Sequence, residues 1–430
     1  MRNEKTIAFH TLGCKLNFSE TDTISRDGVD KGYKVVPFTA PADIYVINSC
    51  TVTKNAEKRC KALIRQAIKT NPASHIAVIG CFSQIKPDEI ANLPGVSMVI
   101  GNADKFNLFE HLKGLADGKP SHPASQSAGK KPESFMPSFS MDGRTRSFFK
   151  IQDGCDYMCA YCTIPMARGR SRSQPIASTL ETARQIAGTN MKEIVLTGVN
   201  IGDFGKAHNE SFFDLLRELA LIDGLERIRI SSVEPDLLHN DIIRLVANEP
   251  KLMPHFHIPL QSGSDKVLNA MGRRYDTGLF SRRIETIRKH IPHACIAADL
   301  IVGFPGESES LFMDSYNFIT DADISYLHVF TYSERENTAA ERRTDQVPQA
   351  ERKRRSKLMQ AISANKKQRF IQKNKGLTTK VLWEKEQHNG LMYGFTENYL
   401  KVKTPFQANL VNQIMTVKLN NTDLSGVYII

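Results

Sequence analysis

The chain has 430 residues, 41% of them hydrophobic, and a net charge of +11. This length is too great for one ordinary core, so two or three domains are expected. No stretch reaches the roughly 18 apolar residues of a membrane span, and the first residues contain no signal-peptide pattern, so a cytoplasmic protein without a membrane partner is predicted. The excess of cations favours a polyanionic partner such as nucleic acid, although many basic proteins bind none.

The first hundred residues contain three apolar, β-rich runs that each lead into a cysteine. "TIAFHTLGC" ends at Cys14, "DIYVINSC" at Cys50 and "HIAVIGC" at Cys81, with helical stretches such as 56–70 between them. Alternation of strand and helix predicts a parallel sheet with right-handed crossovers. Because ligands bind at the carboxyl ends of such strands, we expect the three thiols to converge at one sheet edge.

A stretch rich in Pro, Ser, Gly and Lys follows at 115–140 and predicts a linker. Beyond it, six strand-like runs alternate with amphipathic helices such as 211–222. Six βα units in series predict an incomplete TIM-like (β/α)6 barrel, with functional residues directly after the strands. The predicted strands are 147–152, 193–198, 227–232, 255–260, 295–303 and 325–332.

A charged helical stretch at 349–374 precedes a C-terminal region in which apolar and polar residues alternate between turn signals. This pattern predicts a small antiparallel β-barrel, so the fold class is α/β with a β-rich end. The basic runs 167–173 and 351–357 could contact phosphates, or could be solvated faces. Four aromatic residues could stack on bases or form the strand core. They are Trp383, Tyr393, Phe395 and Tyr399.

Cys155, Cys159 and Cys162 have the spacing C-x3-C-x2-C, directly after the first predicted barrel strand. A loop there can wrap its thiolates around a small cluster, and thiolates are the ligands that iron–sulfur clusters require. Three ligands leave one iron of a four-iron cluster open for chemistry. The alternative is a zinc loop or buried thiols, but structural zinc usually takes four ligands and no fourth Cys or His is obvious nearby.

With an aromatic residue before its last cysteine, this motif resembles the signature of the radical S-adenosylmethionine (SAM) superfamily. The resemblance implies a 4Fe-4S cluster whose open iron binds SAM and whose electron cleaves it to a 5′-deoxyadenosyl radical. The implied SAM contacts are assigned by their place near or after strands, and the glycines among them could instead serve tight turns. They are Tyr161, Thr197, Gly198, Asn200, Gln261, Arg273, Val302 and Gly303.

The order of the parts resembles the radical SAM methylthiotransferases, which combine an N-terminal α/β domain, a radical SAM core and a C-terminal RNA-binding TRAM barrel. By this resemblance Cys14, Cys50 and Cys81 hold a second 4Fe-4S cluster. Cys60 is predicted to be a helix residue, and Cys295 a core residue. The expected boundaries are 1–114 for the α/β domain, 115–140 for the linker, 141–371 for the radical SAM core and 372–430 for TRAM.

The implied reaction replaces an aromatic C–H by S–CH3, at a carbon too weakly acidic or electrophilic for acid–base catalysis. One SAM supplies the methyl group and another the radical; a flavodoxin or ferredoxin is the implied electron donor. "FHTLGCKLNFSET" and "VINSCTVT" most resemble the branch that modifies N6-threonylcarbamoyladenosine at position 37 of tRNA. The alternatives are isopentenyl-adenosine in tRNA, a ribosomal-protein aspartate, or a non-catalytic RNA-binding protein that contains metal.

Overall fold

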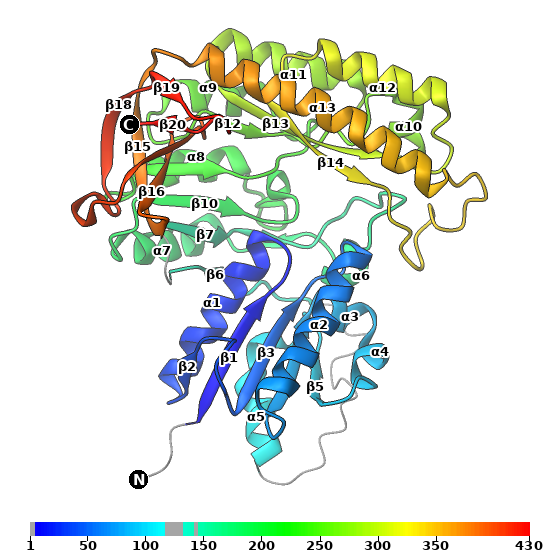
Figure 1. The fold of residues 1–430 in the computed structure, drawn as a ribbon, viewed down its shortest axis with the longest axis vertical. Helices are drawn as coiled ribbons and strands as arrows, with labels where there is room; N and C mark the ends of the chain where they lie inside the picture. Colours follow the sequence, from blue (N-terminus) through cyan, green and yellow to red (C-terminus); the bar gives the residue numbers. More distant parts are fainter. Residues whose placement is uncertain (1–4, 117–131, 142–144) are drawn as a thin grey trace. The chain divides into compact units, whose positions relative to one another are not determined.

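The computed structural model describes residues 5–116, 132–141 and 145–430 (Figure 1). Much of the predicted linker, 115–140, therefore lies outside the described residues. Backbone contacts divide the chain into two compact units. The first comprises Met1–Ser140, Phe148–Met158 and Cys162–Ser173, and the second comprises Met141–Ser147, Cys159–Tyr161 and Gln174–Ile430. Within the described ranges, no helix has the length and apolar character needed to cross a membrane.

A five-stranded parallel sheet, in the order β2-β1-β3-β4-β5, forms the centre of the first unit. Every residue of β3 is buried, and its side chains alternate between two apolar cores, one on each face of the sheet. This sheet is the N-terminal parallel α/β fold that the sequence predicts. Its strands are β1 (Thr6–Thr11), β2 (Lys34–Val36), β3 (Ile44–Ser49), β4 (His75–Gly80) and β5 (Val96–Ile100).

Helices connect these strands, except that β2 and β3 are joined by a loop at 37–43. They are α1 (Lys15–Asp30), α2 (Lys54–Thr70), α3 (Cys81–Ile85), α4 (Pro87–Ala91) and, after β5, η1 (Lys105–Asn107) and α5 (Leu108–Ala116). The later segments of this unit contribute β6 (Ser138–Phe139), β8 (Gln152–Asp153), α6 (Ile164–Arg168) and β9 (Arg172–Ser173).

All six strands predicted after the linker are present. The first, β7 (Arg146–Lys150), begins in the second unit, which also contains β10 (Glu193–Thr197), β11 (Arg227–Ile230), β12 (His255–His257), β13 (Cys295–Val302) and β14 (Tyr326–Thr331). β10 and β11 pair in parallel, and β12-β13-β14 form a second parallel sheet. Isolated bridges such as Ser232↔His257 join the two sheets, and over the described ranges they do not close into a barrel.

Helices again follow the strands of the second unit. They are α7 (Ile176–Ala187), η2 (Ile201–Asp203), η3 (Lys206–His208), α8 (Phe212–Ala220), α9 (Asn240–Asn248), α10 (Asp265–Ala270), α11 (Thr277–His290) and α12 (Glu309–Asp321). The long helix α13 (Gln349–Lys373) then packs against β14 and leads into the C-terminal sheet.

The C-terminal sheet has six strands in the order β18-β15-β16-β17-β20-β19. Its pairs are antiparallel except for the parallel pair β17–β20. Trp383 is completely buried in its core, together with Val381 and Met392. The strands are β15 (Thr378–His388), β16 (Leu391–Thr396), β17 (Lys401–Pro405), β18 (Ile414–Lys418), β19 (Asn421–Thr422) and β20 (Tyr428–Ile429), with η4 (Ala408–Leu410) before β18.

Candidate active site

Three cysteines lie at the carboxyl ends of adjacent strands in the first unit. Cys14 caps α1 after β1, Cys50 follows β3, and Cys81 is the first residue of α3 after β4. The neighbouring backbone is closely packed, because a Cβ added to Gly13 would lie 2.9 Å from the Cys50 Sγ. The structure therefore brings these three predicted ligands together at one sheet edge.

The environment of Cys50 opposes its ionisation. Burial, and then the charges of the Cys81 and Cys14 thiolates, raise the pKa of Cys50 to about 12. A thiol with this pKa stays protonated at neutral pH unless a cation takes the place of its proton. Three converging thiols have the donor chemistry that an iron–sulfur cluster requires.

A buried ion network centred on Glu20 of α1 lies beside these thiols. Lys105 Nζ donates to Glu20 Oε2 at 2.5 Å, Lys150 Nζ to Oε1 at 2.8 Å, and Arg168 Nη1 to Oε1 at 3.0 Å. Asp153 accepts from Arg168 and Lys150 in turn. Burial disfavours the charge on Glu20, but these three cations outweigh it and hold the pKa of the Glu20 carboxyl well below its usual range.

Amide side chains connect this network to the thiols. Asn102 Nδ2 donates to Cys81 Sγ at 3.5 Å, while its Oδ1 accepts from Lys105 at 2.9 Å. Asn17 Oδ1 accepts from Arg168 Nη2 at 2.6 Å and lies 4.0 Å from Cys14 Sγ. Four cations, counting Arg172 on Asp153, face two carboxylates in this network, so positive charge is in excess next to the thiols. The Arg168 charge favours the thiolate form of Cys50.

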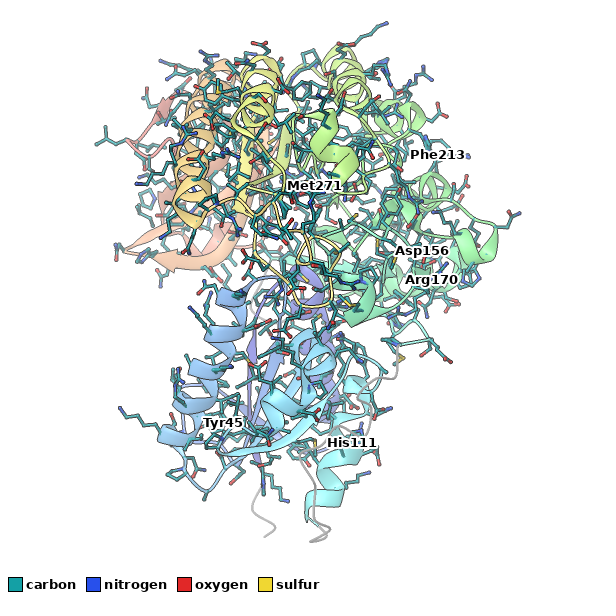
Figure 2. The ribbon with its side chains drawn as sticks, turned by 90° about the vertical axis from the view of Figure 1, so that its right-hand side faces the viewer. Tyr45, His111, Asp156, Arg170, Phe213 and Met271 are labelled. Atoms are coloured by element: carbon teal, nitrogen blue, oxygen red, sulfur yellow. The ribbon has the colours of Figure 1, made fainter. Side chains whose placement is uncertain are left out.

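The basic run 167–173 is only partly available to a phosphate. Arg168 is 1% exposed and belongs to the buried network, contrary to the phosphate-contact interpretation of its run. Arg172 pairs with Asp153. Arg170, by contrast, is exposed and pairs with Asp156 (Figure 2). The sequence shows that Arg168 belongs to a basic run. It does not show its buried partners, because these lie far away along the chain.

Two cysteines of the C-x3-C-x2-C motif belong to the first unit. Backbone N–H groups point at both thiols: that of Tyr157 lies 3.3 Å from Cys155 Sγ, and that of Ile164 lies 3.4 Å from Cys162 Sγ. The loop turns at Gly154, whose φ is +71° and whose added Cβ would lie 2.0 Å from the Arg170 carbonyl oxygen. Backbone donors stabilise thiolates, so this loop is arranged to present sulfur ligands.

The third cysteine of the motif, Cys159, belongs to the second unit. Arg273 donates to its Sγ at 3.1 Å and also contacts Tyr161 Oη at 3.5 Å and Glu234. Burial raises the pKa of Cys159, and the Arg273 charge opposes that effect. Tyr161 packs edge-on against Phe304, with 6.3 Å between ring centroids. The structure thus places the predicted residues Arg273 and Tyr161 around Cys159.

The other predicted SAM contacts lie at or near the ends of strands in the second unit. Thr197 and Val302 end β10 and β13 and are buried, while Gly198 and Asn200 follow β10. The Gly303 N–H donates to Glu307 Oε2 at 2.6 Å, and a Cβ there would lie 2.3 Å from Arg352 Cγ, so the packing leaves no space for a side chain at this position. Gln261 has a φ of +66°, an uncommon backbone conformation for a residue with a side chain.

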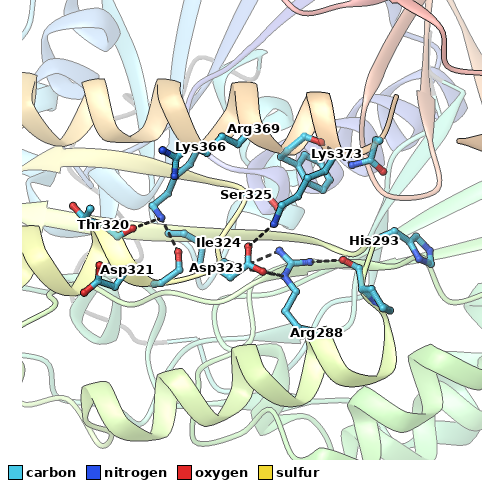
Figure 3. A pocket seen from close by; sticks show the side chains of 14 residues that line it. Arg288, His293, Thr320, Asp321, Asp323, Ile324, Ser325, Lys366, Arg369 and Lys373 are labelled. Atoms are coloured by element: carbon cyan, nitrogen blue, oxygen red, sulfur yellow. Dashed lines mark hydrogen bonds and ion pairs between the residues drawn. The ribbon is translucent and has the colours of Figure 1, made fainter. Parts of the chain in front are cut away.

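A cavity of about 720 Å³ in the second unit lies at the opposite, amino-terminal ends of β13 and β14 (Figure 3). Two of its cations already have protein partners: Lys366 donates to the Thr320 and Ala322 carbonyls, and Arg288 pairs with Asp323. That end of parallel βα units is usually concerned with stability. We therefore assign this cavity a structural role.

Two family models match the chain: "Uncharacterized protein family UPF0004" over residues 6–101 and "Radical SAM superfamily" over residues 149–319. The chain is also similar to a solved radical SAM methyltransferase, TsrM from Kitasatospora setae, whose structure contains cobalamin and a [4Fe-4S] cluster. The TM-score is 0.56 and the identity 13%, over 76% of this chain and 75% of that chain. This likeness concerns the fold.

Closer relatives are known from their sequences. The threonylcarbamoyladenosine tRNA methylthiotransferase MtaB of Bacillus subtilis is 36% identical over 96% of this chain and 93% of its own length. The protein of that name from Thermotoga maritima is 36% identical over 98% and 96%. The tRNA-2-methylthio-N(6)-dimethylallyladenosine synthase of Nitratidesulfovibrio vulgaris is 30% identical over 89% and 87%. This chain therefore belongs to the radical SAM methylthiotransferases, transferases that depend on SAM and iron–sulfur clusters.

Proposed function

We propose that this enzyme converts N6-threonylcarbamoyladenosine at position 37 of tRNA into its 2-methylthio derivative. The observation that carries the proposal is the convergence of Cys14, Cys50 and Cys81 at one sheet edge, in addition to the C-x3-C-x2-C motif. Two thiol sites match a reaction that needs both a radical and a transferable sulfur. The 36% identity to enzymes named for threonylcarbamoyladenosine supports this substrate over the alternatives.

Cys14, Cys50 and Cys81 would hold one 4Fe-4S cluster, and the cysteines of the motif the other. When bound, two SAM molecules and the clusters would supply the methyl group and the radical. The chain's own groups prepare these sites: Tyr157 and Ile164 N–H groups orient thiolates, and Arg273 balances charge at Cys159. The proposed SAM-binding residues are Tyr161, Thr197, Gly198, Asn200, Gln261, Arg273, Val302 and Gly303.

We assign RNA binding to residues 372–430 as a TRAM domain, the radical SAM core to 141–371 and the second cluster to 1–114, joined by a linker at 115–140. Tyr393 of the C-terminal sheet is half-buried, and Lys401 Nζ lies 4.0 Å from its ring centroid. An aromatic ring beside an ammonium group suits a base and its phosphate. The reaction would take place in the cytoplasm with a flavodoxin or ferredoxin as electron donor.

Cys50→Ala tests the proposal, with Cys60→Ala as the matched control, because Cys60 is a buried thiol of α2 outside the proposed ligands. Wild type and C60A should carry about eight iron atoms per chain and C50A about four. Mass spectrometry of tRNA from a complemented deletion strain should show the methylthio nucleoside with wild type and C60A, and not with C50A. Purified C50A should still cleave SAM. Product from C50A, or loss of its SAM cleavage, contradicts the assignment.

The 30% identity to a dimethylallyladenosine synthase makes isopentenyl-adenosine in tRNA the second candidate substrate. Reconstituted enzyme offered tRNA with either modification separates the two. Methylthiolation of the threonylcarbamoyl substrate alone is expected. Turnover of the isopentenyl substrate alone would replace the proposed substrate while leaving the reaction class intact.

A further inference from the structure

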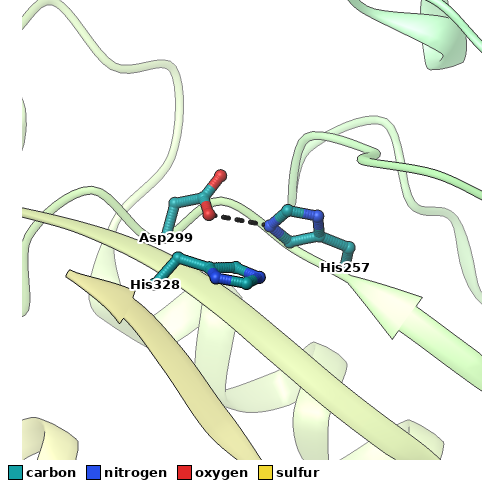
Figure 4. A group of neighbouring side chains, drawn as sticks. All are labelled: His257, Asp299 and His328. Carbon is teal, nitrogen blue, oxygen red and sulfur yellow. Dashed lines mark hydrogen bonds and ion pairs between the residues drawn. The ribbon is translucent and has the colours of Figure 1, made fainter. Parts of the chain in front are cut away.

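Three side chains of types that can ligate a metal lie on adjacent strands of the second unit, outside both cysteine sites. They are His257 of β12, Asp299 of β13 and His328 of β14, and each offers one ligand atom within 4.8 Å of the other two (Figure 4). None of them belongs to the SAM-binding residues proposed above. Two imidazoles and one carboxylate are a recurring ligand set for divalent transition metals.

Strand register places these side chains on one face. Asp299 pairs directly with His328 across β13–β14. His257 pairs with Ala297, which is two residues before Asp299 on the same strand. Because side chains alternate along a strand, Ala297 and Asp299 point to the same face. The three ligands are therefore positioned by the sheet itself, without any loop having to move.

The hydrogen bonds of His257 fit a metal ligand. Its Nε2 lies 2.8 Å from Asp299 Oδ1, where both atoms could bind one ion. Its Nδ1 lies 3.0 Å from Ser232 Oγ, which can fix the tautomer that leaves Nε2 free to coordinate. The His328 ring is held by Tyr326, at 5.3 Å and 86°, and lies 5.4 Å from the His257 ring.

The site is sheltered but accessible. The side chains of His257 and Asp299 are 19% and 20% exposed, and His328 is exposed. An ion could enter from the His328 side, and three protein ligands would leave coordination positions open there. We propose that His257, Asp299 and His328 form a third metal site, which takes a divalent transition-metal ion such as Zn2+ and keeps an open position for water or an anionic oxygen.

Zinc binding to the intact protein tests this proposal. The protein is first reconstituted with iron and sulfide, so that the cysteine sites are filled, and is then dialysed against Zn2+. Metal analysis should give about one zinc per chain. X-ray absorption at the zinc edge should show N/O ligands at about 2.0–2.2 Å and no sulfur at about 2.3 Å.

Variants assign the zinc to these residues. Asp299→Asn keeps the side-chain shape and should lose most zinc binding, as should His328→Ala. Ser232→Ala should weaken zinc affinity about 10–100-fold, since it removes only the partner of a ligand. His290→Ala, an exposed histidine at the end of α11, is the control and should bind like wild type. Iron content and circular dichroism verify that each variant is folded.

Three results would overturn the proposal: no zinc bound by the reconstituted wild type, sulfur in the zinc shell, or unchanged zinc affinity in both D299N and H328A. The first would leave the three side chains as a metal-free hydrogen-bonded group. The second would place the zinc at unfilled cysteines. The proposed tRNA reaction does not depend on any of these outcomes, because the nucleoside assay measures it separately.

Discussion

At the residue scale, the backbone around Cys50 leaves no space for a side chain at Gly13. Gly13 has a φ of +100°, and an added Cβ would lie 2.8 Å from Cys50 Cβ and 2.9 Å from its Sγ. Glycine adopts this backbone conformation without steric cost, whereas other residues are strained by it. Gly13, which precedes Cys14, must therefore be a glycine because Cys50, another proposed ligand, lies directly against it.

We expect Gly13→Ala to displace Cys50 and to lose the iron of the N-terminal site, which is about half of the total. Gly32→Ala is the matched control, because Gly32 has a φ of +84° but nothing within 4 Å of its added Cβ. Backbone strain should lower the free energy of unfolding of both variants by about 1–3 kcal/mol, which urea unfolding measures. Only G13A should lose iron, and equal iron content in the two variants would refute the role assigned to Gly13.

The sequence predicted that Cys14, Cys50 and Cys81 converge, because each carries a local signal. Cys14, Cys50 and Cys81 share the end of an apolar run, and the structure brings them together. The Glu20 network carried no such signal. Glu20 meets Lys105 and Arg168, which lie 85 and 148 positions away in the chain. Only the folded sheet brings these charges together. From the sequence alone, Arg168 was therefore interpreted as an exposed cation.

At the element scale, the positions of the strands along the chain were predictable, but the extent of their pairing was not. The run 255–260 predicts a full strand, yet β12 ends at His257. Pro259 has no N–H to donate to a ladder, and Gln261 has a positive φ. The neighbouring strand, β11, meets β12 through isolated bridges. Over the described ranges, the strands of the predicted incomplete barrel therefore lie in two separate sheets that isolated bridges link.

The strand β11 also holds the C-terminal sheet through two buried arginines. Arg227 donates to the carbonyls of Phe395 and Lys380 at 3.1 and 2.8 Å. Arg229 donates to the Glu397 carbonyl at 3.1 Å and to Glu193 Oε1 at 2.8 Å. These bonds satisfy backbone carbonyls of the C-terminal sheet. The Glu193 carboxylate holds Arg229 in position, so this ion pair also stabilises the contact between β11 and the C-terminal sheet.

Arg229→Met should reduce the free energy of unfolding by about 3–5 kcal/mol, because it leaves Glu193 buried with fewer cations. Hydrogen exchange in β16 and the turn after it should accelerate. Lys192→Ala is the control: Lys192 pairs with Glu226 on the exposed surface at 2.6 Å, and its loss should cost below about 1 kcal/mol. If R229M and K192A lose the same free energy of unfolding, burial does not make the Arg229–Glu193 pair more important than an exposed ion pair.

The same ion pair predicts how stability depends on pH. Burial opposes the charge on Glu193, but Arg229 and its neighbouring arginines lower its pKa from 4.5 to about 2. A lowered carboxyl pKa adds stability that is present above pH 4.5 and is lost as the pH falls towards 2. Urea unfolding should therefore show a loss of about 3 kcal/mol across this range, which is smaller in R229M. An unchanged pH profile in R229M would show that other carboxylates set it.

At the scale of the whole molecule, the net charge of +11 overstates the cations available to RNA. Within the run 351–357, Arg352 and Arg355 are buried and pair with Glu334 and Glu307. Lys353 and Lys357 of the same helix are exposed. Arg352 and Arg355 therefore fit neither interpretation of the run, and whether Lys353 and Lys357 contact phosphates stays a prediction.

This division predicts the salt dependence of tRNA binding. Each lysine that contacts a phosphate contributes roughly one unit to the slope of log K against log[salt], because it releases a condensed counterion. Removing Lys353 and Lys357 together should reduce that slope by about two if both contact tRNA, and filter binding over a range of salt concentrations measures it.

The matched control is the double variant of Lys58 and Lys69 to Ala, which removes the same charge from exposed positions of α2. If binding depends on specific phosphate contacts of α13, this control keeps the wild-type slope. If the two double variants lose the same slope, tRNA responds to the total charge of the protein and α13 is not a contact surface. A slope unchanged in both would place the phosphate contacts elsewhere, and the half-buried Tyr393 with Lys401 would be the next residues to test.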